Sequence, residues 1–222
     1  KTTVIRALMG LLPVGGEVTE GTLLFNGKDL RNLSKAEWRS IRGKDMAMIF
    51  QDSGSALDPI VRIGKQFREL FKAHIEISND ECDRRAIELL ESVALPNCAD
   101  ILRRYPHELS GGQRQRVGIA MALALDPALL IGDEPTSALD VTTQSQVVMQ
   151  MMELSKVHNS AIVMVTHNLG VAAYMSDYII VMKKGRVVDA GTPQEILENP
   201  SNEYTKQLKD AVPTLGGGRY ID

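Results

Sequence analysis

Three apolar runs alternate with helical segments, and no other feature of this sequence constrains the fold as strongly. The runs cover residues 46–50, 128–132 and 161–166, and each has the length and aliphatic content of a buried strand. Residues 141–157, between the second and third runs, are predicted to form a helix. A strand, a helix and a strand joined by short links predict parallel strands with a right-handed crossover. The sequence therefore predicts an α/β fold built on a mostly parallel sheet.

Residues 53–109 differ from their surroundings because helical periodicity dominates them and no strand is predicted there. They are predicted to form a helical subdomain inserted between strands, with capping-box spacing at Ser78 and Glu81. The other predicted elements are a helix at 3–12 ended by Pro13, a strand at 22–25 followed by an Asn26-Gly27 turn, a helix capped by Ser34 and Glu37, a helix at about 111–125, a hairpin of residues 177–183 and 186–190 around Lys184-Gly185, and a final pair of helices capped by Thr192, Pro193 and Glu195.

The composition fits one large globular domain. The chain has 222 residues, of which 44% are hydrophobic and 24% charged, as in an ordinary protein with a sizeable core. The net charge of −3 provides no overall attraction to nucleic acid or anionic lipid. No apolar run reaches the roughly 18 residues needed to cross a bilayer. Cys82 and Cys98 lack metal-ligand spacing and are expected to be free thiols.

Two adjacent carboxylates, Asp133 and Glu134, directly follow the strand predicted at 128–132. In open parallel sheets, ligands bind beyond the carboxyl ends of the strands. One carboxylate at such a place can hold Mg²⁺ through water, and the other can orient or deprotonate an attacking water. The alternative is a strand that happens to end in a solvated Asp-Glu turn, and the pair alone does not decide between the two.

Ser110, Gly111, Gly112 and Gln113 begin the helix predicted at 111–125. Ser110 and Gln113 have the spacing of an ordinary capping box. The glycines do not fit that role alone, because each costs up to about 1 kcal/mol relative to alanine in a helix. A Gly-Gly start lets a bulky anion approach the backbone N–H groups, where the helix dipole adds positive partial charge. The motif therefore predicts a phosphate site.

Other polar residues stand at positions that suit a nucleotide site. His167 and Gln51 each follow a predicted strand, so they are expected at the same sheet edge as the acidic pair. Lys1, Thr2 and Thr3 open the first helix. In a phosphate loop the lysine reaches the β- and γ-phosphates and the next hydroxyl binds Mg²⁺. Each of these features alone also has a structural explanation, and it is their order along the chain that points to function.

That order is Lys-Thr-Thr, a strand with Gln, Leu-Ser-Gly-Gly-Gln, a strand with Asp-Glu, and a strand with His. It resembles the ATP-binding cassette (ABC) family over essentially the whole chain, and residues 109–113 match that family's signature motif letter for letter. The resemblance implies a P-loop NTPase fold with an inserted helical subdomain and a partial antiparallel β subdomain. It implies one ABC ATPase domain over 1–222, divided into a helical subdomain at 53–115, a core at 116–200, and a C-terminal helix and tail at 201–222.

The resemblance also implies where nucleotide and metal bind. Lys1 would bind the β- and γ-phosphates of ATP, Thr2 would coordinate Mg²⁺ and Thr3 would reach the α-phosphate. Asp133 matches the Walker B aspartate, and Gln51 matches the Q-loop glutamine that touches Mg²⁺ or the attacking water. The family has a glycine-rich loop, preceded by a strand and an aromatic that stacks on adenine, immediately before the lysine. The chain is therefore expected to be an N-terminally truncated piece of a longer protein.

Catalysis is implied to use Glu134, which would position water, together with His167 at the γ-phosphate and Gln51. The tip formed by residues 110–113 would bind ATP held by an opposite cassette, and Asp140 lies in the loop that crosses this dimer interface. The family therefore implies a second cassette as partner, in a homodimer or a heterodimer. It also implies two polytopic membrane permease subunits and a solute-binding protein, with no nucleic-acid partner. The expected location is peripheral, on the cytoplasmic face of the cell membrane.

Finer similarity favours the oligopeptide and dipeptide importers, a branch that also contains nickel importers, so the cargo stays open. The alternatives are an ABC ATPase of DNA repair, chromosome organisation or translation, an exporter cassette fused to membrane helices, and a scaffold without activity. The residues that carry the similarity are 49–52 (Ile-Phe-Gln-Asp), 105–109 (Tyr-Pro-His-Glu-Leu), 113–117 (Gln-Arg-Gln-Arg-Val) and 135–141 (Pro-Thr-Ser-Ala-Leu-Asp-Val), and the departures from the branch are Gly132, Asp58 and the Asn202-Glu203 pair.

Overall fold

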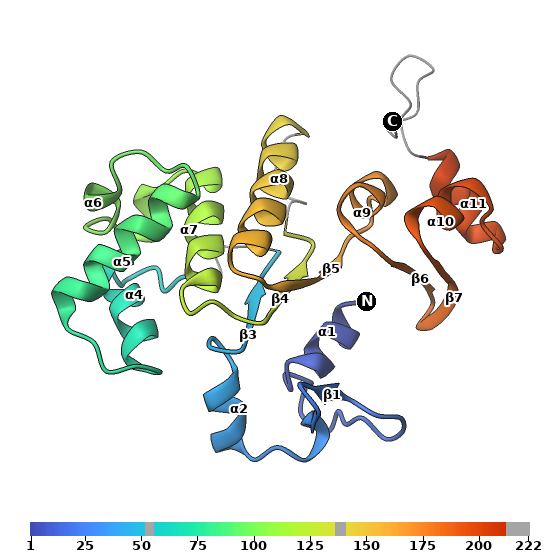
Figure 1. Ribbon diagram of the computed structural model, residues 1–222, viewed down its shortest axis with the longest axis horizontal. Helices are drawn as coiled ribbons and strands as arrows, with labels where there is room; N and C mark the ends of the chain where they lie inside the picture. The colour runs from blue at the N-terminus through green and yellow to red at the C-terminus, as the bar shows by residue number, and fades with distance from the viewer. Residues whose placement is uncertain (52–55, 136–140, 212–222) are drawn as a thin grey trace. The chain divides into compact units, whose positions relative to one another are not determined.

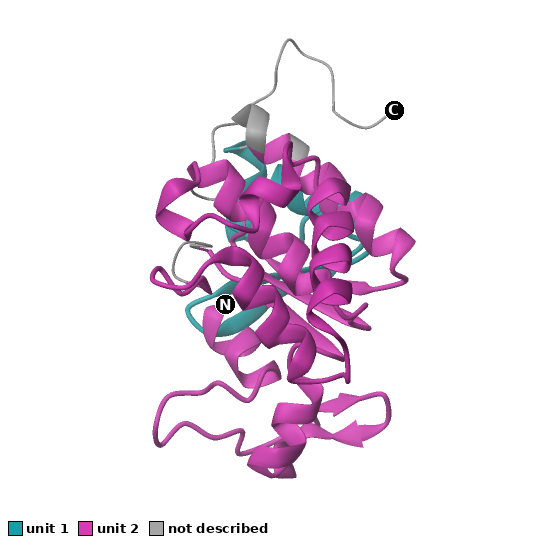
Figure 2. Ribbon diagram, turned by 90° about the vertical axis from the view of Figure 1, so that its left-hand side faces the viewer, with its two compact units in different colours: residues 1, 166–222 teal, residues 2–165 magenta. Residues whose placement is uncertain are grey.

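A computed structural model describes residues 1–51, 56–135 and 141–211 of the chain. The chain divides into two compact units, which are coloured separately in Figure 2. The larger unit is Thr2–Val165, and the smaller one contains Lys1 and the chain from Thr166 onward. None of the described helices is both long enough and apolar enough to span a membrane.

The larger unit is built on a sheet of three parallel strands in the order β3-β4-β5 (Figure 1). These strands are β3 (Met46–Ile49), β4 (Leu129–Asp133) and β5 (Ala161–Val165). Helix α8 (Val141–Val157) lies between β4 and β5 in the chain, as the strand–helix–strand pattern predicts. The parallel sheet predicted from the sequence is confirmed.

Strands β3 and β4 of this sheet bury side chains on both faces. Met46 and Ile131 face one side, where they share an apolar cluster with Ile5 of the first helix, α1 (Thr2–Leu8). Ala47, which follows Met46, and Leu130, which precedes Ile131, belong to the larger apolar cluster on the other side. Because successive side chains of a strand point to opposite faces, this alternation places helices on both sides of the sheet. Figure 1 shows α1 and α2 on one side and α7 and α8 on the other.

The first helix ends earlier than the prediction of a helix over 3–12, which is wrong at its C-terminal end. Gly10 has a φ of +60°, and its N–H together with that of Leu11 closes the last turn. The bond from Leu11 N to Arg6 O, at 2.7 Å, is the long bond of a Schellman motif. Glycine is the residue that adopts this left-handed conformation without cost, so the helix stops there rather than at Pro13.

The turn at Gly10 is held by residues from the second helix, α2 (Lys35–Ile41), and the position after it. The Arg42 guanidinium donates to the carbonyls of Met9, at 2.7 Å, and Gly10, at 2.6 Å, and it stacks over the Trp38 ring. The predicted Ser34–Glu37 capping box at the start of α2 is confirmed. Between α1 and α2 lie the short antiparallel strands β1 (Leu24–Phe25) and β2 (Lys28–Asp29), joined by the predicted Asn26-Gly27 turn, and the 3-10 helix η1 (Leu30–Asn32).

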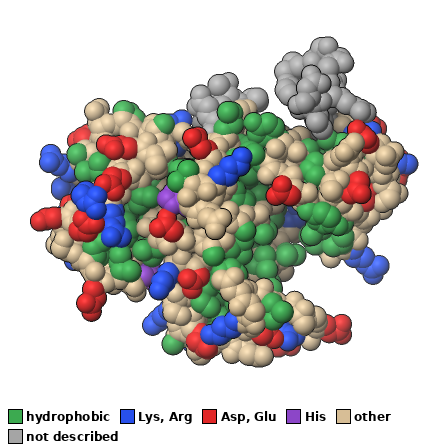
Figure 3. Space-filling model, viewed as in Figure 1, with side chains coloured by type: hydrophobic (Ala, Val, Ile, Leu, Met, Phe, Trp, Pro, Cys, Tyr) green, Lys and Arg blue, Asp and Glu red, His purple; other side chains and the backbone are tan. Residues whose placement is uncertain are grey.

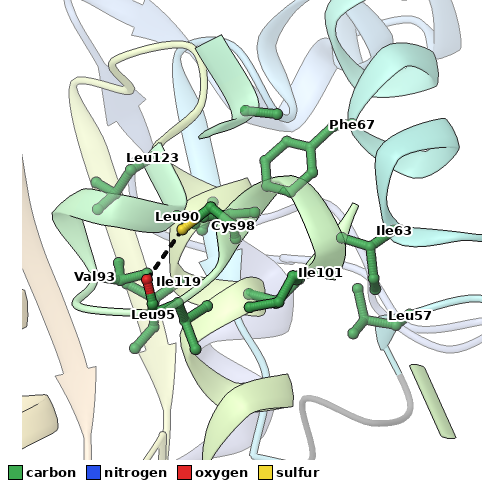
Figure 4. Packing of buried hydrophobic residues seen from close by; sticks show 14 of the residues in the cluster. Leu57, Ile63, Phe67, Leu90, Val93, Leu95, Cys98, Ile101, Ile119 and Leu123 are labelled. Carbon is green, nitrogen blue, oxygen red and sulfur yellow. Dashed lines mark hydrogen bonds between the residues drawn. The ribbon is translucent and has the colours of Figure 1, made fainter. Parts of the chain in front are cut away.

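The predicted helical segment contains helices only, within the part of it that the structure describes. Figure 4 shows part of the core of the larger unit, in which Phe67 and Leu90 of this segment are fully buried together with Ile119 of α7, the helix that follows it. The predicted capping box at Ser78 is only half formed, because Glu81 directs its carboxylate to arginines of its own helix. The elements are α4 (Ile63–Lys72), α5 (Asn79–Ser92), α6 (Cys98–Ile101), the 3-10 helix η2 (Pro106–Glu108) and α7 (Gly111–Leu123).

Both cysteines are buried within this helical segment and are free thiols, as predicted. Cys82 lies on α5 and Cys98 on α6. The Cys98 thiol donates to the carbonyl of Leu95 at 3.0 Å, the dashed contact in Figure 4. Burial raises the pKa of the Cys98 thiol, which makes it a poor nucleophile.

The smaller unit is an antiparallel hairpin packed with short helices. Its apolar cluster joins Leu169, Ile179, Val181 and Ile196. The predicted hairpin is confirmed, and the predicted cap at Thr192 forms a complete capping box. Its elements are α9 (Leu169–Met175), β6 (Ile179–Lys183), β7 (Arg186–Gly191), α10 (Pro193–Glu198) and α11 (Glu203–Asp210). The subdomain boundaries given by the family resemblance, at 53–115, 116–200 and 201–222, stay a prediction.

Candidate functional site

The acidic pair lies at the carboxyl end of β4, the middle strand of the sheet. Asp133 is the last residue of the strand and is buried, with 8% of its surface exposed. The Thr2 hydroxyl donates to its Oδ1 at 3.3 Å. Thr2 reaches this position because α1 begins there and packs against the sheet through Ile5. The structure thus joins two residues that are 131 positions apart and that the sequence analysis assigned to one metal site.

Glu134 occupies a strained backbone conformation directly after the strand. Its φ is +46°, in the left-handed region that a glutamate seldom adopts. Its N–H donates to the carbonyl of Val165 at 2.8 Å, which continues the pairing with β5. The next residue, Pro135, is buried against Gly132. Strained backbone of this kind occurs often where a side chain must be aimed for function.

Gln51 leaves the sheet at the same edge as the acidic pair. Strands β3 and β4 are parallel, and Ile49 lies opposite Gly132. Gln51 and Glu134 each follow those paired residues by two positions, so both chains pass the edge of the sheet at the same level. The Gln51 side chain is exposed there. Its predicted position beside Asp133 and Glu134 agrees with this register.

The diglycine motif forms the N-terminal tip of α7. The Ser110 hydroxyl accepts from Gln113 N at 3.2 Å, and the side-chain amide oxygen of Gln113, Oε1, accepts from Ser110 N at 2.9 Å, so the capping box is complete. A Cβ atom placed on Gly111 or Gly112 would meet nothing within 4 Å. Neither crowding nor backbone conformation within the described chain therefore explains the two glycines, which leave open space where side chains would stand.

The remaining predicted site residues, Lys1, Thr3, His167 and Asp140, lie in different parts of the chain. Lys1 belongs to the smaller unit, where its ammonium donates to the carbonyl of Thr166 at 2.9 Å, and His167 follows Thr166 in that unit with an exposed side chain. Thr3 lies exposed in the first turn of α1. Asp140 lies outside the residues that the structure describes.

The Thr2 hydroxyl and the Asp133 carboxylate, which meet at this edge, are oxygen donors, and Gln51, which follows the neighbouring strand at the same level, also carries an amide oxygen. Such donors suit Mg²⁺ and do not suit the softer transition metals. Over the described ranges, no group of three or more His, Cys, Asp or Glu residues could hold a metal by itself. On the face drawn in Figure 3, acidic and basic side chains are interspersed, in keeping with the small net charge.

The sequence analysis missed one residue that contacts the turn after β4, and one that holds the far end of α1. Arg42 fixes the C-terminal end of α1, and nothing in its local sequence indicates that contact. Gln115 is buried on α7, and its side-chain amide donates to the carbonyl of Pro135, the residue after Glu134. A signal for Gln115 does exist in the sequence, because it stands at helical spacing with Ile119 and Ala122 on the apolar face of its helix.

Known proteins similar to this chain were found by sequence. The dipeptide transport ATP-binding protein DppD of Lactococcus lactis subsp. cremoris is 46% identical over 216 residues, which are 97% of this chain and 62% of that protein. The oligopeptide transport ATP-binding protein OppD of Bacillus subtilis is 45% identical, over 97% of this chain and 60% of that protein. The chain thus spans about three fifths of the length of these relatives.

Solved structures similar to this one are ATP-binding cassettes. One is a dimeric cassette in a post-hydrolysis state bound to ADP and Pi, with a TM-score of 0.74 and 29% identity, over 86% of this chain and 80% of that one. Another is cbiO1 of Clostridium perfringens, with a TM-score of 0.72 and 27% identity, over 88% of this chain and 73% of that one. The predicted fold class, an ABC cassette with a parallel sheet and a small antiparallel sheet, is confirmed.

The family itself follows from a profile match. The profile described as ABC transporter matches residues 1–137, which is more than half of the 222-residue chain and includes the signature motif and the acidic pair. The predicted similarity to the oligopeptide and dipeptide importer branch is also confirmed by the relatives named above. This chain belongs to the ABC transporter family.

Proposed function

We propose that this chain is the ATP-binding and ATP-hydrolysing part of a subunit that powers the import of peptides or a related small solute. The observation that carries the proposal is the edge at which Thr2 donates to Asp133 while Glu134 is held in a strained conformation beside it. A hydroxyl, a metal-binding carboxylate and a second carboxylate are the groups that phosphoryl transfer to water requires. The names of the relatives, dipeptide and oligopeptide transport ATP-binding proteins, support the transport role.

In this proposal each side chain has one task. The Glu134 carboxylate accepts a hydrogen bond from the attacking water and aligns it with the γ-phosphorus. Gln51, at the same edge, and His167 contact the reacting phosphate, while Lys1 and Thr3 bind the phosphate chain of ATP. Asp133 has a hydroxyl partner in Thr2 and is shielded from bulk water, so it keeps a fixed position.

Mg²⁺ is proposed as the cofactor because its preferred oxygen donors are present in Thr2, Asp133 and Gln51. When bound, the ion withdraws charge from the phosphate oxygens and orients them. The chain's own contribution is to hold the Thr2 hydroxyl and the Asp133 carboxylate at hydrogen-bonding distance of each other, 3.3 Å, before nucleotide arrives. Preorganisation of this kind lowers the entropic cost of assembling the site.

A second cassette is proposed to complete the site. The Gly111-Gly112 pair leaves open space at the start of α7, and the N–H groups of a helix start suit the γ-phosphate of ATP held by an opposite copy. Asp140 is proposed to lie at that interface. The similar solved cassette is dimeric with ADP and Pi bound, which supports this arrangement. ATP bridges the two copies better than its products do, so hydrolysis drives their separation.

Two polytopic membrane permease subunits and a solute-binding protein are proposed as the further partners, with the cassette peripheral on the cytoplasmic face of the membrane. The cargo is proposed to be a peptide rather than nickel, because the relatives named above are peptide transporters. Uptake of a labelled dipeptide and of labelled Ni²⁺ by cells with and without the full-length protein separates the two cargoes. Loss of Ni²⁺ uptake with unchanged peptide uptake would contradict the peptide assignment.

The test of ATP hydrolysis is Glu134→Gln in the full-length protein. We expect ATPase activity to fall about 10²- to 10⁴-fold while ATP still binds, because the amide keeps the shape of the carboxylate and loses its basicity. Glu153→Gln, on the exposed side of α8, is the matched control and should leave both activity and binding unchanged. Near-normal ATPase activity of Glu134→Gln would remove this residue from the mechanism.

A further inference from the structure

Gln115 is one of few buried polar side chains among the described residues, with 4% of its surface exposed. It lies on the face of α7 that also buries Ile119 and Ala122. An amide in such a place is costly unless it is hydrogen-bonded, and an apolar residue would fill the same space without that cost. The buried glutamine therefore needs hydrogen-bond partners close to its amide. One of them is the carbonyl of Pro135, to which the Gln115 side-chain N–H donates.

At least three contacts from described residues hold the turn that carries Glu134. The N–H of Glu134 is bonded to Val165, and the Pro135 ring lies so close to Gly132 that an added Cβ there would be 3.2 Å from it. Both of these contacts come from the sheet itself. The third contact, from Gln115 to the Pro135 carbonyl, is the one of the three that comes from a helix. A peptide group bonded at this carbonyl has its orientation fixed, and so does the strained residue before it.

The same helix begins at the diglycine tip. Gln115 follows Ser110 by five positions, which corresponds to about 7.5 Å along the helix axis. Because α7 is a continuous helix, a displacement of its tip is carried to Gln115 and so to the carbonyl of Pro135. One side chain thus ties the position of the tip to the direction of Glu134.

We propose that Gln115 is a positioning residue that orients the Glu134 side chain through its hydrogen bond to the Pro135 carbonyl. It also couples this orientation to the binding of the α7 tip to nucleotide. The inference rests on the proposed function, because it assumes that Glu134 aligns water and that the tip meets ATP of a second copy. In a cassette whose α7 tip is not bound to the ATP of the second copy, Glu134 would be less well aligned with the attacking water. Hydrolysis would then await closure of both copies.

The first test compares Gln115→Met with wild type in the full-length protein. Methionine has nearly the size of glutamine and no donor, so the helix face stays filled while the bond to Pro135 is lost. We expect kcat for ATP hydrolysis to fall about tenfold or more and KM for ATP to change less than about twofold, since a misaimed group affects the reacting state and not substrate binding. An unchanged kcat would overturn the proposal.

Gln66→Met is the matched control. Gln66 is a buried glutamine on α4 whose amide donates to the carbonyls of Asp58 and Val61, at 3.0 and 2.8 Å. Its replacement should lower stability as Gln115→Met does and leave kcat unaltered. Equal losses of kcat in the two variants would mean that Gln115 has a structural role only. If Gln115→Met fails to fold, Gln115→Asn replaces it, because its amide is one methylene too short to reach Pro135.

A double-mutant cycle with Glu134→Gln asks whether Gln115 acts through that carboxylate. We expect the replacement of Gln115 to cost about tenfold in a single-turnover rate when Glu134 is present and less than about twofold when it is glutamine. Equal costs in both backgrounds would refute the positioning role. Absence of any ATPase activity in the wild-type protein would instead contradict the proposed function.

Discussion

Substitution of Gly112 by alanine tests separately whether this glycine is needed for folding stability and whether it is needed for binding the proposed phosphate ligand. Gly112 lies in the first turn of α7, and a Cβ atom there would meet nothing within 4 Å. The substitution introduces no clash and removes the conformational freedom that glycine has in the unfolded chain. We therefore expect Gly112→Ala to stabilise the folded protein while impairing ATP hydrolysis.

The size of the effect follows from the open surroundings of the residue. A glycine replaced by alanine in a compatible conformation gains about 0.4–1 kcal/mol of stability. In a protein of this size about 1 kcal/mol corresponds to roughly 2–4 °C in Tm, so Tm should rise by about 1–4 °C. Activity should move the opposite way, because the added methyl group stands between the N–H groups of the tip and the approaching phosphate.

The assay is thermal unfolding of the full-length protein without nucleotide, together with ATPase activity of the same preparation. Gly10→Ala is the matched control with the opposite expectation, because Gly10 has a φ of +60° and its added Cβ would lie 2.4 Å from the Trp38 ring. That variant should lose more than about 1 kcal/mol. A lower Tm for Gly112→Ala would refute the reasoning about open space, and unchanged ATPase activity would refute the approach of a ligand.

Other perturbations test the core, the metal donors and a helix cap. Phe67→Ala, at a side chain with no exposed surface, should destabilise the protein by about 3–5 kcal/mol in urea unfolding, and a loss below about 1 kcal/mol would contradict the packing shown in Figure 4. Thr2→Ala should raise the Mg²⁺ concentration for half-maximal ATPase activity about 10- to 100-fold, since Asp133 loses its hydroxyl partner; an unchanged Mg²⁺ dependence would exclude this role. The backbone N–H of Ser34 is the main cause that lowers the pKa of Glu37 to about 2 from 4.5, so the stabilisation is complete above pH 4.5 and is lost as pH falls toward 2. The Tm difference between wild type and Glu37→Gln should therefore shrink over that range, and a constant difference would contradict the cap.

The sheet and its acidic edge could be predicted from the sequence because they depend on local patterns. Strand length, the crossover helix and the position of Asp133 after an apolar run determine that the carboxylate lies at a sheet edge. The capping boxes at Ser34 and Thr192 were likewise readable, since each is closed by residues three positions apart. These features need no knowledge of which distant residues come into contact.

Contacts between distant residues were not accessible in this way. The helix predicted over 3–12 runs past the end of α1 because Leu11 is apolar and fits the helical period. The left-handed turn at Gly10 ends the helix, and the contact that holds this turn comes from Arg42, 32 positions away. The cap at Ser78 fails for a local reason, because Arg84 and Arg85, three and four positions after Glu81, bind the carboxylate that would complete it. Capping-box spacing alone does not show that such a competing partner is present.

Several residues of the larger unit adopt conformations or environments that their residue type disfavours. A structural role within the chain accounts for some of them and not for others. Ala94 has a positive φ because it closes the end of α5, through hydrogen bonds to that helix. Glu134 has a positive φ without a helix end to close, the Gly111-Gly112 pair faces open space, and Gln115 buries an amide in an apolar face. These three exceptions lie along one path, from the tip of α7 through Gln115 to the turn after β4. Natural sequences break local preferences mainly at functional sites, so selection for function rather than for stability accounts for this path.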